Sequence, residues 1–473
     1  RSVTLPHDAM ITEPRSEKSR GIHNIGWFEA QDYVYTKKFQ ISESYRGKCF
    51  FFEIEGAYRN ASVYINGKEA AYRPNGYSDF FLDATEYIRV GRENEIEVHT
   101  KNSDQPNSRW YSGTGLYRPV NMYVAEPDHI LLNGVKVSTV LTSPPRIQVE
   151  IMTTGAGDAK IQILDQGEEV TSVDMWVDKR GTVEITLPEA KLWSTESPYL
   201  YQCRVAYKQD VQEVTFGVRS LEWNKEKGLA INGERVILRG ACIHHDNGVL
   251  GACAFKEAEE RKVRILKENG YNAIRSAHNP CSKALLDACD RYGMLVMDEY
   301  VDVWYIHKTE YDYADYMEKW WKTDLREMVD KDYNHPSVIL YSTGNEVAET
   351  AQKKGIDLTR RMTEYLHELD GTRPVTCGVN IFFNFLSSIG FGVYSDDKAK
   401  KEAKKAACNA DNVNSEKKKK PVGSEFYNTL AGMLGDKAMK LGATLYPCDV
   451  KTRDAYANMD IAGYNYGIFR YMH

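Results

Sequence analysis

The residues best suited to catalysis end the stretch "VILYSTGNE", which runs from Val338 to Glu346. Its apolar run predicts a buried strand, and Asn345 and Glu346 stand where that strand ends. A carboxyl group at such a position suits a general acid, while the neighbouring amide can hydrogen-bond a substrate hydroxyl. The alternative is that Glu346 favours the positive end of a following helix. The pattern alone does not separate these two interpretations.

Other polar side chains follow apolar runs in the same part of the chain. They are His244, His245 and Asp246, then Arg275 and His278, then Asp298 and Glu299. Helical stretches such as "AEERKVRILKENG" and "SKALLDACDRYG" separate the runs. This alternation predicts a parallel α/β sheet, here a (β/α)8 TIM barrel, in which the carboxyl ends of the strands form one face. We therefore expect these side chains to lie near Glu346.

The predicted barrel occupies residues 220–473 and is two strands short. Six candidate strands occur, the last two at Pro374 to Asn380 and at Asp460 to Gly467. The chain ends soon after the sixth of them. We therefore expect a TIM-barrel catalytic domain that is incomplete at the C-terminus of this sequence.

Two all-β domains precede the barrel. Residues 1–126 contain short alternating runs, with Asn66-Gly67 between two of them, which predicts a β-sandwich and a tight hairpin. Residues 127–219 contain further strands whose number and spacing suit an immunoglobulin-like β-sandwich. Neither domain has a reactive set of residues of its own.

The composition argues against several classes of function. A net charge of −6 provides no basic face for nucleic acid, and no apolar run approaches the roughly 18 residues that span a membrane. The nine cysteines include no C-x-x-C pair, which favours free thiols in a reducing bacterial cytoplasm over disulfides or zinc. His244 and His245 are adjacent, so they face opposite sides of a strand, and we expect no metal. The first residue is Arg1 rather than Met, so secretion with a trimmed leader is the alternative.

Two long motifs resemble glycoside hydrolase family 2. "DYNHPSVILYSTGNE" is similar to its acid/base signature, with Tyr341 where the family usually has Trp. "NAIRSAHNPCSKALLDACDRYGMLVMDE" is similar to its other signature, with Asn279 where many members have Tyr. "GYSDFFLDATEYIRVGRENEIEV" and "SRWYSGTGLYR" resemble its jelly-roll sugar-binding domain, so the likeness covers nearly the whole chain. The chain is most similar to gut bacterial β-glucuronidases, although β-galactosidases share these motifs.

The resemblance implies a retaining, exo-acting hydrolase that needs no cofactor. Glu346 would protonate the glycosidic oxygen, a second Glu would attack the anomeric carbon, and Glu346 would then activate water. Glu425, in "PVGSEFYN", resembles a nucleophile motif. In the family, however, the nucleophile follows the "NYG" strand, and Glu425 precedes Tyr464 to Gly467. We therefore expect the nucleophile beyond His473.

Several other residues are candidate substrate contacts. Asn345 could hydrogen-bond a sugar hydroxyl as the amide beside Glu346, and family position implies the same contact for His278, the alternative for His278 being a packed core histidine. Asp246 would do the same at the mouth of the first strand, or else form a turn. Tyr466, in "NYG", would hydrogen-bond the nucleophile, although as a bare sequence feature it is one aromatic among many.

Two more candidates come from loops. Trp304 would stack on the aglycone, with core packing as the equal alternative. Arg109 lies in "SRWYSGTGLYR", a loop that the family extends toward the active site. It is the one cation visible near the site for a glucuronide carboxylate, and its alternative is a surface ion pair.

Three hypotheses for the function follow from these features. The first is a β-D-glucuronidase, and the second is a β-galactosidase of the same family. The third, from another class, is a carbohydrate-binding protein without catalysis. We also expect a homo-oligomer, and the lysine-rich segment 396–420 is predicted to be a solvated face, with a lid or an oligomer contact as the alternative.

Overall fold

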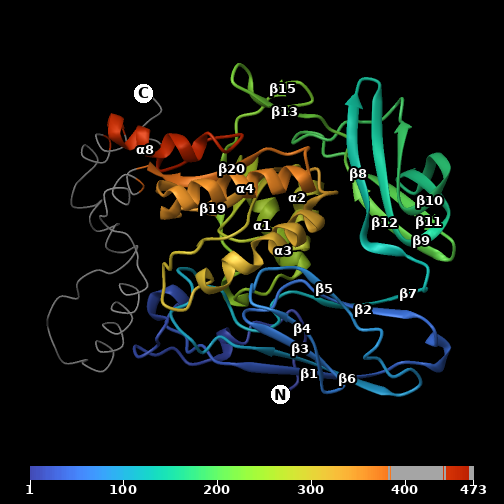
Figure 1. Ribbon diagram of the computed structural model, residues 1–473, viewed down its shortest axis with the longest axis horizontal. Helices are drawn as coiled ribbons and strands as arrows, with labels where there is room; N and C mark the ends of the chain where they lie inside the picture. Colours follow the sequence, from blue (N-terminus) through green and yellow to red (C-terminus); the bar gives the residue numbers. More distant parts are fainter. Residues whose placement is uncertain (382–383, 385–439, 441–443, 468–473) are drawn as a thin grey trace.

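The computed structural model describes residues 1–381, 384, 440 and 444–467, which form three domains (Figure 1). The first β-domain lies along one side of the central α/β domain, and the second β-domain lies at one end of it (Figure 1). These are the three domain types predicted from the sequence, and the fold class is confirmed. The expected domain boundaries stay a prediction.

The N-terminal domain is a sandwich of two antiparallel sheets. One has the order β1 (Tyr33–Gln40), β6 (Glu93–Thr100), β3 (Ala61–Ile65) and β4 (Lys68–Arg73), and the other has the order β5 (Phe80–Asp83), β2 (Cys49–Ile54) and β7 (Val120–Ala125). Between β3 and β4, Asn66 and Gly67 have φ angles of 52° and 80°. Two successive left-handed residues make the tight hairpin turn that the Asn-Gly pair predicted.

The second domain is the predicted immunoglobulin-like sandwich. Its strands are β8 (Ile130–Thr142), β9 (Pro145–Asp165), β10 (Glu168–Thr186), β11 (Tyr201–Tyr207) and β12 (Asp210–Phe216). The first half of β9 pairs with β8 and its second half pairs with β11, while β10 follows β9 throughout. The long strand β9 thus passes from one part of the sandwich to the other. Alternating apolar residues along it, such as Ile147, Val149 and Ile151, fill the core.

The third domain contains the predicted parallel sheet. Its order is β16 (Gly240–Ile243), β17 (Ala273–Ser276), β18 (Leu295–Glu299), β19 (Val338–Asn345), β20 (Val375–Asn380) and β21 (Gly463–Asn465). The helices are α1 (Lys256–Glu268), α2 (Lys283–Tyr292), α3 (Ala314–Asp332), α4 (Lys353–Leu369) and α8 (Tyr446–Tyr456). All neighbouring strands are parallel. Among the described residues, one edge of β16 and one edge of β21 stay unpaired, as expected for six strands of a barrel.

Burial explains why these segments take their places. Every residue of β19 is buried, as expected for a parallel strand covered on both faces. On α3, Met317, Trp321, Leu325 and Met328 recur at helical spacing and pack into the core beneath the helices. The small sheet of β13 (Leu221–Asn224), β14 (Gly228–Ile231) and β15 (Glu234–Arg235) contributes to a separate apolar cluster. That cluster contains the first residues of β17 and β18, so the small sheet lies at the amino-terminal end of the barrel strands.

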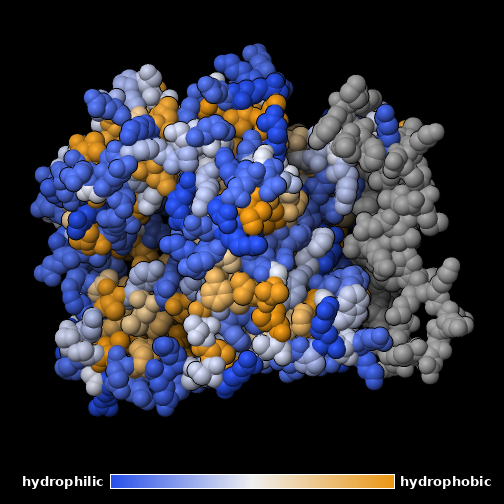
Figure 2. All heavy atoms as spheres, turned by 180° about the vertical axis from the view of Figure 1, so that it is seen from behind, coloured by the Kyte–Doolittle hydropathy of each residue, from blue (hydrophilic) through white to orange (hydrophobic). Residues whose placement is uncertain are grey.

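Short 3-10 helices complete the described structure. They are η1 (Met10–Thr12), η2 (Ile22–Ile25), η3 (Glu43–Tyr45), η4 (Gly248–Leu250) and η5 (Ala348–Ala351). The face shown in Figure 2 is mostly hydrophilic, with hydrophobic side chains in separate groups. None of the described helices is long and apolar enough to cross a membrane. The segment 396–420 and Glu425 lie outside the described residues, so the expectations for them stay predictions.

Polar contacts hold the two β-domains on the barrel. Arg73 of β4 donates two hydrogen bonds to Glu327 Oε1 of α3, at 3.0 and 3.1 Å. The buried Arg118 donates from Nη2 to the carbonyl of Pro280 at 2.7 Å. From the second domain, Arg219 donates to the carbonyl oxygens of Pro336 and Val338 at 2.6 and 2.7 Å. The last two bonds attach the second domain to the start of β19.

Candidate active site

Glu346 lies directly beyond the carboxyl end of β19, where the backbone turns sharply. Its φ angle is 47°, and its N–H donates to the carbonyl of Gly378 on β20 at 2.6 Å. Oε1 accepts a hydrogen bond from Asn380 Nδ2 at 3.1 Å, and Oε2 lies 3.6 Å from Arg109 Nη1. The next helical element, η5, begins at Ala348 with Val347 as its N-cap and has no side-chain capping hydrogen bond, so the helix-capping alternative finds no support. The carboxylate is instead held from two sides at the barrel mouth.

Asn345, the last residue of β19, is buried in a set of hydrogen bonds at the strand ends. Its Oδ1 accepts from Asn465 Nδ2 at 2.7 Å and from Arg275 Nη2 at 3.1 Å. Its Nδ2 donates to Asp302 Oδ1 at 2.9 Å. These three partners come from β21, from β17 and from the loop after β18. The amide that precedes Glu346 therefore has a fixed position.

Arg275, which bonds Asn345, also forms a buried ion pair with Glu299. Glu299, fully buried at the end of β18, accepts two hydrogen bonds from Arg275, at 2.8 and 2.6 Å. It also contacts His278 Nδ1 at 2.6 Å and accepts a bond from Ser342 Oγ at 2.5 Å. Burial raises the pKa of Glu299, but Arg275, His278 and Ser342 outweigh burial, and the net pKa is lowered. The ionised carboxylate thus orients His278 at the mouth.

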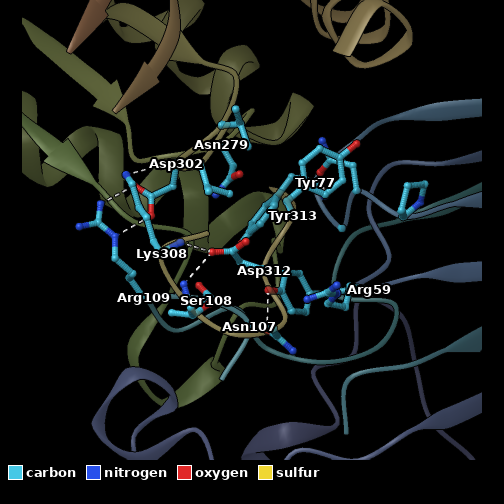
Figure 3. Close-up of a pocket in the computed structure, with 17 residues that line it drawn as sticks. Arg59, Tyr77, Asn107, Ser108, Arg109, Asn279, Asp302, Lys308, Asp312 and Tyr313 are labelled. Carbon is cyan, nitrogen blue, oxygen red and sulfur yellow. Dashed lines mark hydrogen bonds and ion pairs between the residues drawn. The ribbon is translucent and has the colours of Figure 1, made fainter. Parts of the chain in front are cut away.

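Arg109 belongs to the sandwich domain and lies at the mouth of the barrel. It donates to Asp302 from Nε at 2.8 Å and from Nη2 at 2.5 Å, and its side chain is only 11% exposed (Figure 3). Lys308 donates to the carbonyl of Asn345 at 2.6 Å and lies 3.3 Å from Asp302 Oδ1. Burial raises the pKa of Asp302, yet Arg109 and Lys308 together lower it far below its usual value. The ion pair of the alternative interpretation of Arg109 is present, but it is largely buried rather than on the surface. The substrate contact stays a prediction.

The remaining predicted site residues lie in different surroundings. Asp246 is exposed just beyond β16. Tyr466 follows β21 and is 58% exposed, and the nearby Glu346 carboxylate raises the pKa of its phenol more than burial does. Both residues therefore lie at the mouth, as expected for substrate contacts. Their roles stay predictions.

Trp304 has no exposed surface. Its Nε1 donates to the carbonyl of Thr343 at 3.0 Å, and a side chain on Gly344 would come within 2.8 Å of that nitrogen. The indole thus packs against the end of β19, which supports the packing alternative. The expected stacking on an aglycone is not compatible with this burial.

Replacing Trp304 by Phe tests this assignment. We expect the variant to lose about 1–3 kcal/mol of stability, because a buried carbonyl loses its donor and the smaller ring leaves a space. KM values for two substrates with small and large aryl aglycones should change by the same factor. A loss of affinity confined to the large aglycone would instead restore the stacking role, with thermal unfolding measured in parallel.

The adjacent residues His244 and His245 pack against different neighbours. His244 packs against Trp110 and His278, with ring centroids 4.4 and 5.4 Å away, whereas His245 packs against Tyr77 at 4.8 Å. Burial lowers the pKa of both imidazoles. The described residues that could jointly reach a metal are Asp287, Asp290 and His335. In that group His335 Nδ1 and Asp290 Oδ2 already form a hydrogen bond of 2.6 Å. The expected absence of a metal or cofactor stays a prediction.

Four residues at the mouth were missed in the sequence. Asn380 and Asn465 end apolar strands just as Asn345 does, so the same rule would have found them. Asp302 and Lys308 lie in the loop after β18, where charged residues of a barrel often face the site. Nothing in their spacing showed that both would meet Arg109.

Comparison with known protein families assigns each domain to one group. Residues 3–125 match the description "Glycosyl hydrolase 2 galactose-binding domain-like". Residues 134–219 match "Glycosyl hydrolases family 2", and residues 224–441 match "Glycosyl hydrolases family 2, TIM barrel domain". The matches follow one another along the chain in the order of the three domains.

Individual proteins agree with these matches. A β-galactosidase of Bacteroides ovatus is 33% identical over 80% of this chain and 51% of its own length. A β-glucuronidase of Bacteroides fragilis is 26% identical over 80% of this chain and 58% of its own length. A crystal structure of a glycosyl hydrolase family 2 member from Bacteroides cellulosilyticus superposes with a TM-score of 0.81 at 32% identity, covering 98% of this chain and 55% of that one. The chain thus spans about half the length of these relatives.

Proposed function

Because the chain belongs to glycosyl hydrolase family 2, we propose that the full-length protein is a retaining, exo-acting β-glycosidase. The observation that carries this proposal is the position of Glu346. Its carboxylate lies at the carboxyl end of a barrel strand, beside an amide fixed by three hydrogen bonds. This is the face on which barrel enzymes carry their catalytic groups.

The proposed reaction is a double displacement. Glu346 donates a proton to the glycosidic oxygen as the bond to the leaving group breaks, and a second carboxylate attacks the anomeric carbon. In the second half Glu346 accepts a proton from water, which then releases the sugar with its original configuration. The two carboxyl groups of such an enzyme lie about 5–5.5 Å apart. We expect the nucleophile beyond His473.

For the sugar we propose a β-D-glucuronide, with a β-galactoside as the alternative. The overall resemblance supports the glucuronide, while the relatives include proteins named for each activity. The described cations near Glu346 are already paired, since Arg109 and Lys308 both contact Asp302. A glucuronidase therefore needs further donors for the C6 carboxylate, and we expect them beyond His473.

Side-by-side assays of the full-length protein test the choice of sugar. We expect kcat/KM for p-nitrophenyl β-glucuronide to exceed that for the β-galactoside by about tenfold or more, because a charge-assisted pair to the carboxylate is lost with the neutral sugar. Faster hydrolysis of the galactoside would reverse the assignment. The mechanism would not change, because both sugars would use the same carboxylate pair.

The alternative from another class is a carbohydrate-binding protein without catalysis. It would bind sugar through the sandwich domain and the aromatic residues of the barrel mouth. Calorimetry with the full-length protein separates this possibility from the enzyme. Sugar binding together with no turnover of any aryl β-glycoside would favour it over hydrolysis.

A further inference from the structure

The loop that contains Asn107 to Trp110 belongs to the sandwich domain. It reaches the barrel mouth and is held there by contacts with both domains. Within the sandwich, Asn24 Nδ2 donates to the carbonyl of Ser108 at 2.9 Å, and Tyr58 donates its hydroxyl proton to Asn107 Oδ1 at 2.9 Å. On the barrel side, Trp110 packs against His244 and His278 with ring centroids 4.4 and 5.6 Å away. Arg109 lies between these anchors. Its guanidinium therefore occupies a defined place beside Glu346.

The charge of Arg109 is directed at two carboxylates. Two of its nitrogens bond Asp302, and the third, Nη1, lies 3.6 Å from Glu346 Oε2. Burial lowers the pKa of Arg109, but Asp302 and Glu346 outweigh burial and raise it. The guanidinium therefore stays charged in a site that excludes most water. A charge of this kind is weakly screened.

Lys308 is a second partner of Asp302. It approaches Asp302 from the loop after β18 and is 12% exposed (Figure 3). Arg109 thus contacts both Asp302 and Glu346, whereas Lys308 forms its ion pair with Asp302.

Three other groups in the described part of the chain interact with Glu346. Asn380, from β20, is a neutral donor, and Tyr466, from beyond β21, is a phenol whose pKa the carboxylate raises. Lys308 also interacts electrostatically with Glu346. Among the described residues, Arg109 is thus the cation that forms an ion pair with the carboxylate, at 3.6 Å.

We propose that Arg109 is a positioning residue for the acid/base: from the sandwich domain, it holds the Glu346 carboxylate in place at the barrel mouth. This inference rests on the proposed function and deepens it. It makes the sandwich domain part of the catalytic unit, because the residue that holds the acid/base comes from another domain. The proton balance of the reaction is unchanged, since Arg109 neither gains nor loses a proton.

Substrates with different leaving groups test the proposal in the full-length enzyme. Arg109→Met removes the contact to Glu346 Oε2, so the carboxylate is no longer held for proton transfer. We expect kcat/KM for an aryl glycoside with a poor leaving group to fall by roughly tenfold or more, because that substrate needs the proton from Glu346. For a dinitrophenyl glycoside, which needs little protonation to depart, kcat/KM should change much less. Its kcat should fall with the slower second step, and added azide should restore part of that rate.

Two further variants separate this effect from loss of structure. Arg109→Lys keeps the charge, and we expect it to recover most of the activity on the substrate with the poor leaving group. Arg73→Met breaks an ion pair between the same two domains, in which the Arg and Glu side chains are 20% and 14% exposed, away from Glu346. It should lower the melting temperature without changing the ratio of kcat/KM between the two substrates.

Each outcome decides the proposal. Equal losses of kcat/KM for the two substrates in Arg109→Met overturn it, and so does a rise in KM alone, as for a direct substrate contact. If Glu346→Gln is as active as the wild type, the proposed function falls and this inference falls with it. If Glu346→Gln is inactive and rescued by azide while Arg109→Met loses equal activity on both substrates, only this inference is wrong.

Discussion

A Glu346→Gln variant of the full-length protein is expected to lose about 10²–10⁴-fold in kcat/KM on glycosides with poor leaving groups, the usual scale of general acid-base catalysis. The amide keeps the shape of the side chain and can still contact Asn380 and Arg109. It cannot donate a proton to the glycosidic oxygen or accept one from water. Steady-state hydrolysis of a series of aryl glycosides measures the loss.

Leaving-group dependence and azide identify the role of the residue. A dinitrophenyl glycoside needs little protonation to depart, so its first step should be nearly normal and its second step slow. Azide, which needs no general base, should then restore turnover. Glu364→Gln, at an exposed position of α4, is the matched control and should retain full activity. Equal losses for good and poor leaving groups, without any azide effect, would remove the acid/base assignment.

The second large effect is expected from Arg275→Met. The change removes two hydrogen bonds and the balancing charge from Glu299, which is fully buried. Breaking a buried pair from one side costs about 3–5 kcal/mol, because the remaining charge stays buried without compensation. For a domain of this size, a loss of that magnitude lowers the melting temperature by roughly 10 °C. Scanning calorimetry of the barrel transition measures it.

Arg264→Met supplies the comparison for Arg275→Met. Arg264 pairs with Glu268 on the surface of α1, where the two side chains are 47% and 58% exposed. Surface pairs of this kind contribute about 0–1 kcal/mol. We therefore expect almost no change in its melting temperature. Similar losses in the two variants would mean that the Arg275 pair does not depend on burial.

Acidification should weaken the same pair in the wild type. The net pKa of Glu299 is lowered in the folded protein, because its polar partners outweigh burial. The stabilisation is therefore complete above the ordinary glutamate pKa of about 4.3 and is lost as the pH falls below it. Above that value the contribution of Glu299 should not depend on pH.

Much of the fold could be predicted because local patterns carry it. Alternating residues in the first two domains and strand-helix repetition after residue 220 each reflect which face of an element is buried. The Asn66-Gly67 hairpin follows from left-handed backbone geometry that these two residues adopt easily. The position of Glu346 at a strand end followed from the same periodicity, since parallel strands present their carboxyl ends on one face.

The side-chain contacts at the site could not be predicted from the sequence, because they depend on how the domains and loops pack. Arg109 and Asp302 are 193 positions apart, and only the packing of the sandwich on the barrel brings the guanidinium to Glu346. Trp304 is a residue of the kind that often stacks on sugars. The packing of the loop after β18 instead buries it against the end of β19. The sequence alone determined the elements, their order and the acid/base candidate, because these follow from local periodicity and motif. The tertiary structure decided which charges surround that carboxylate, because ion pairs between domains depend on distances that no local pattern encodes.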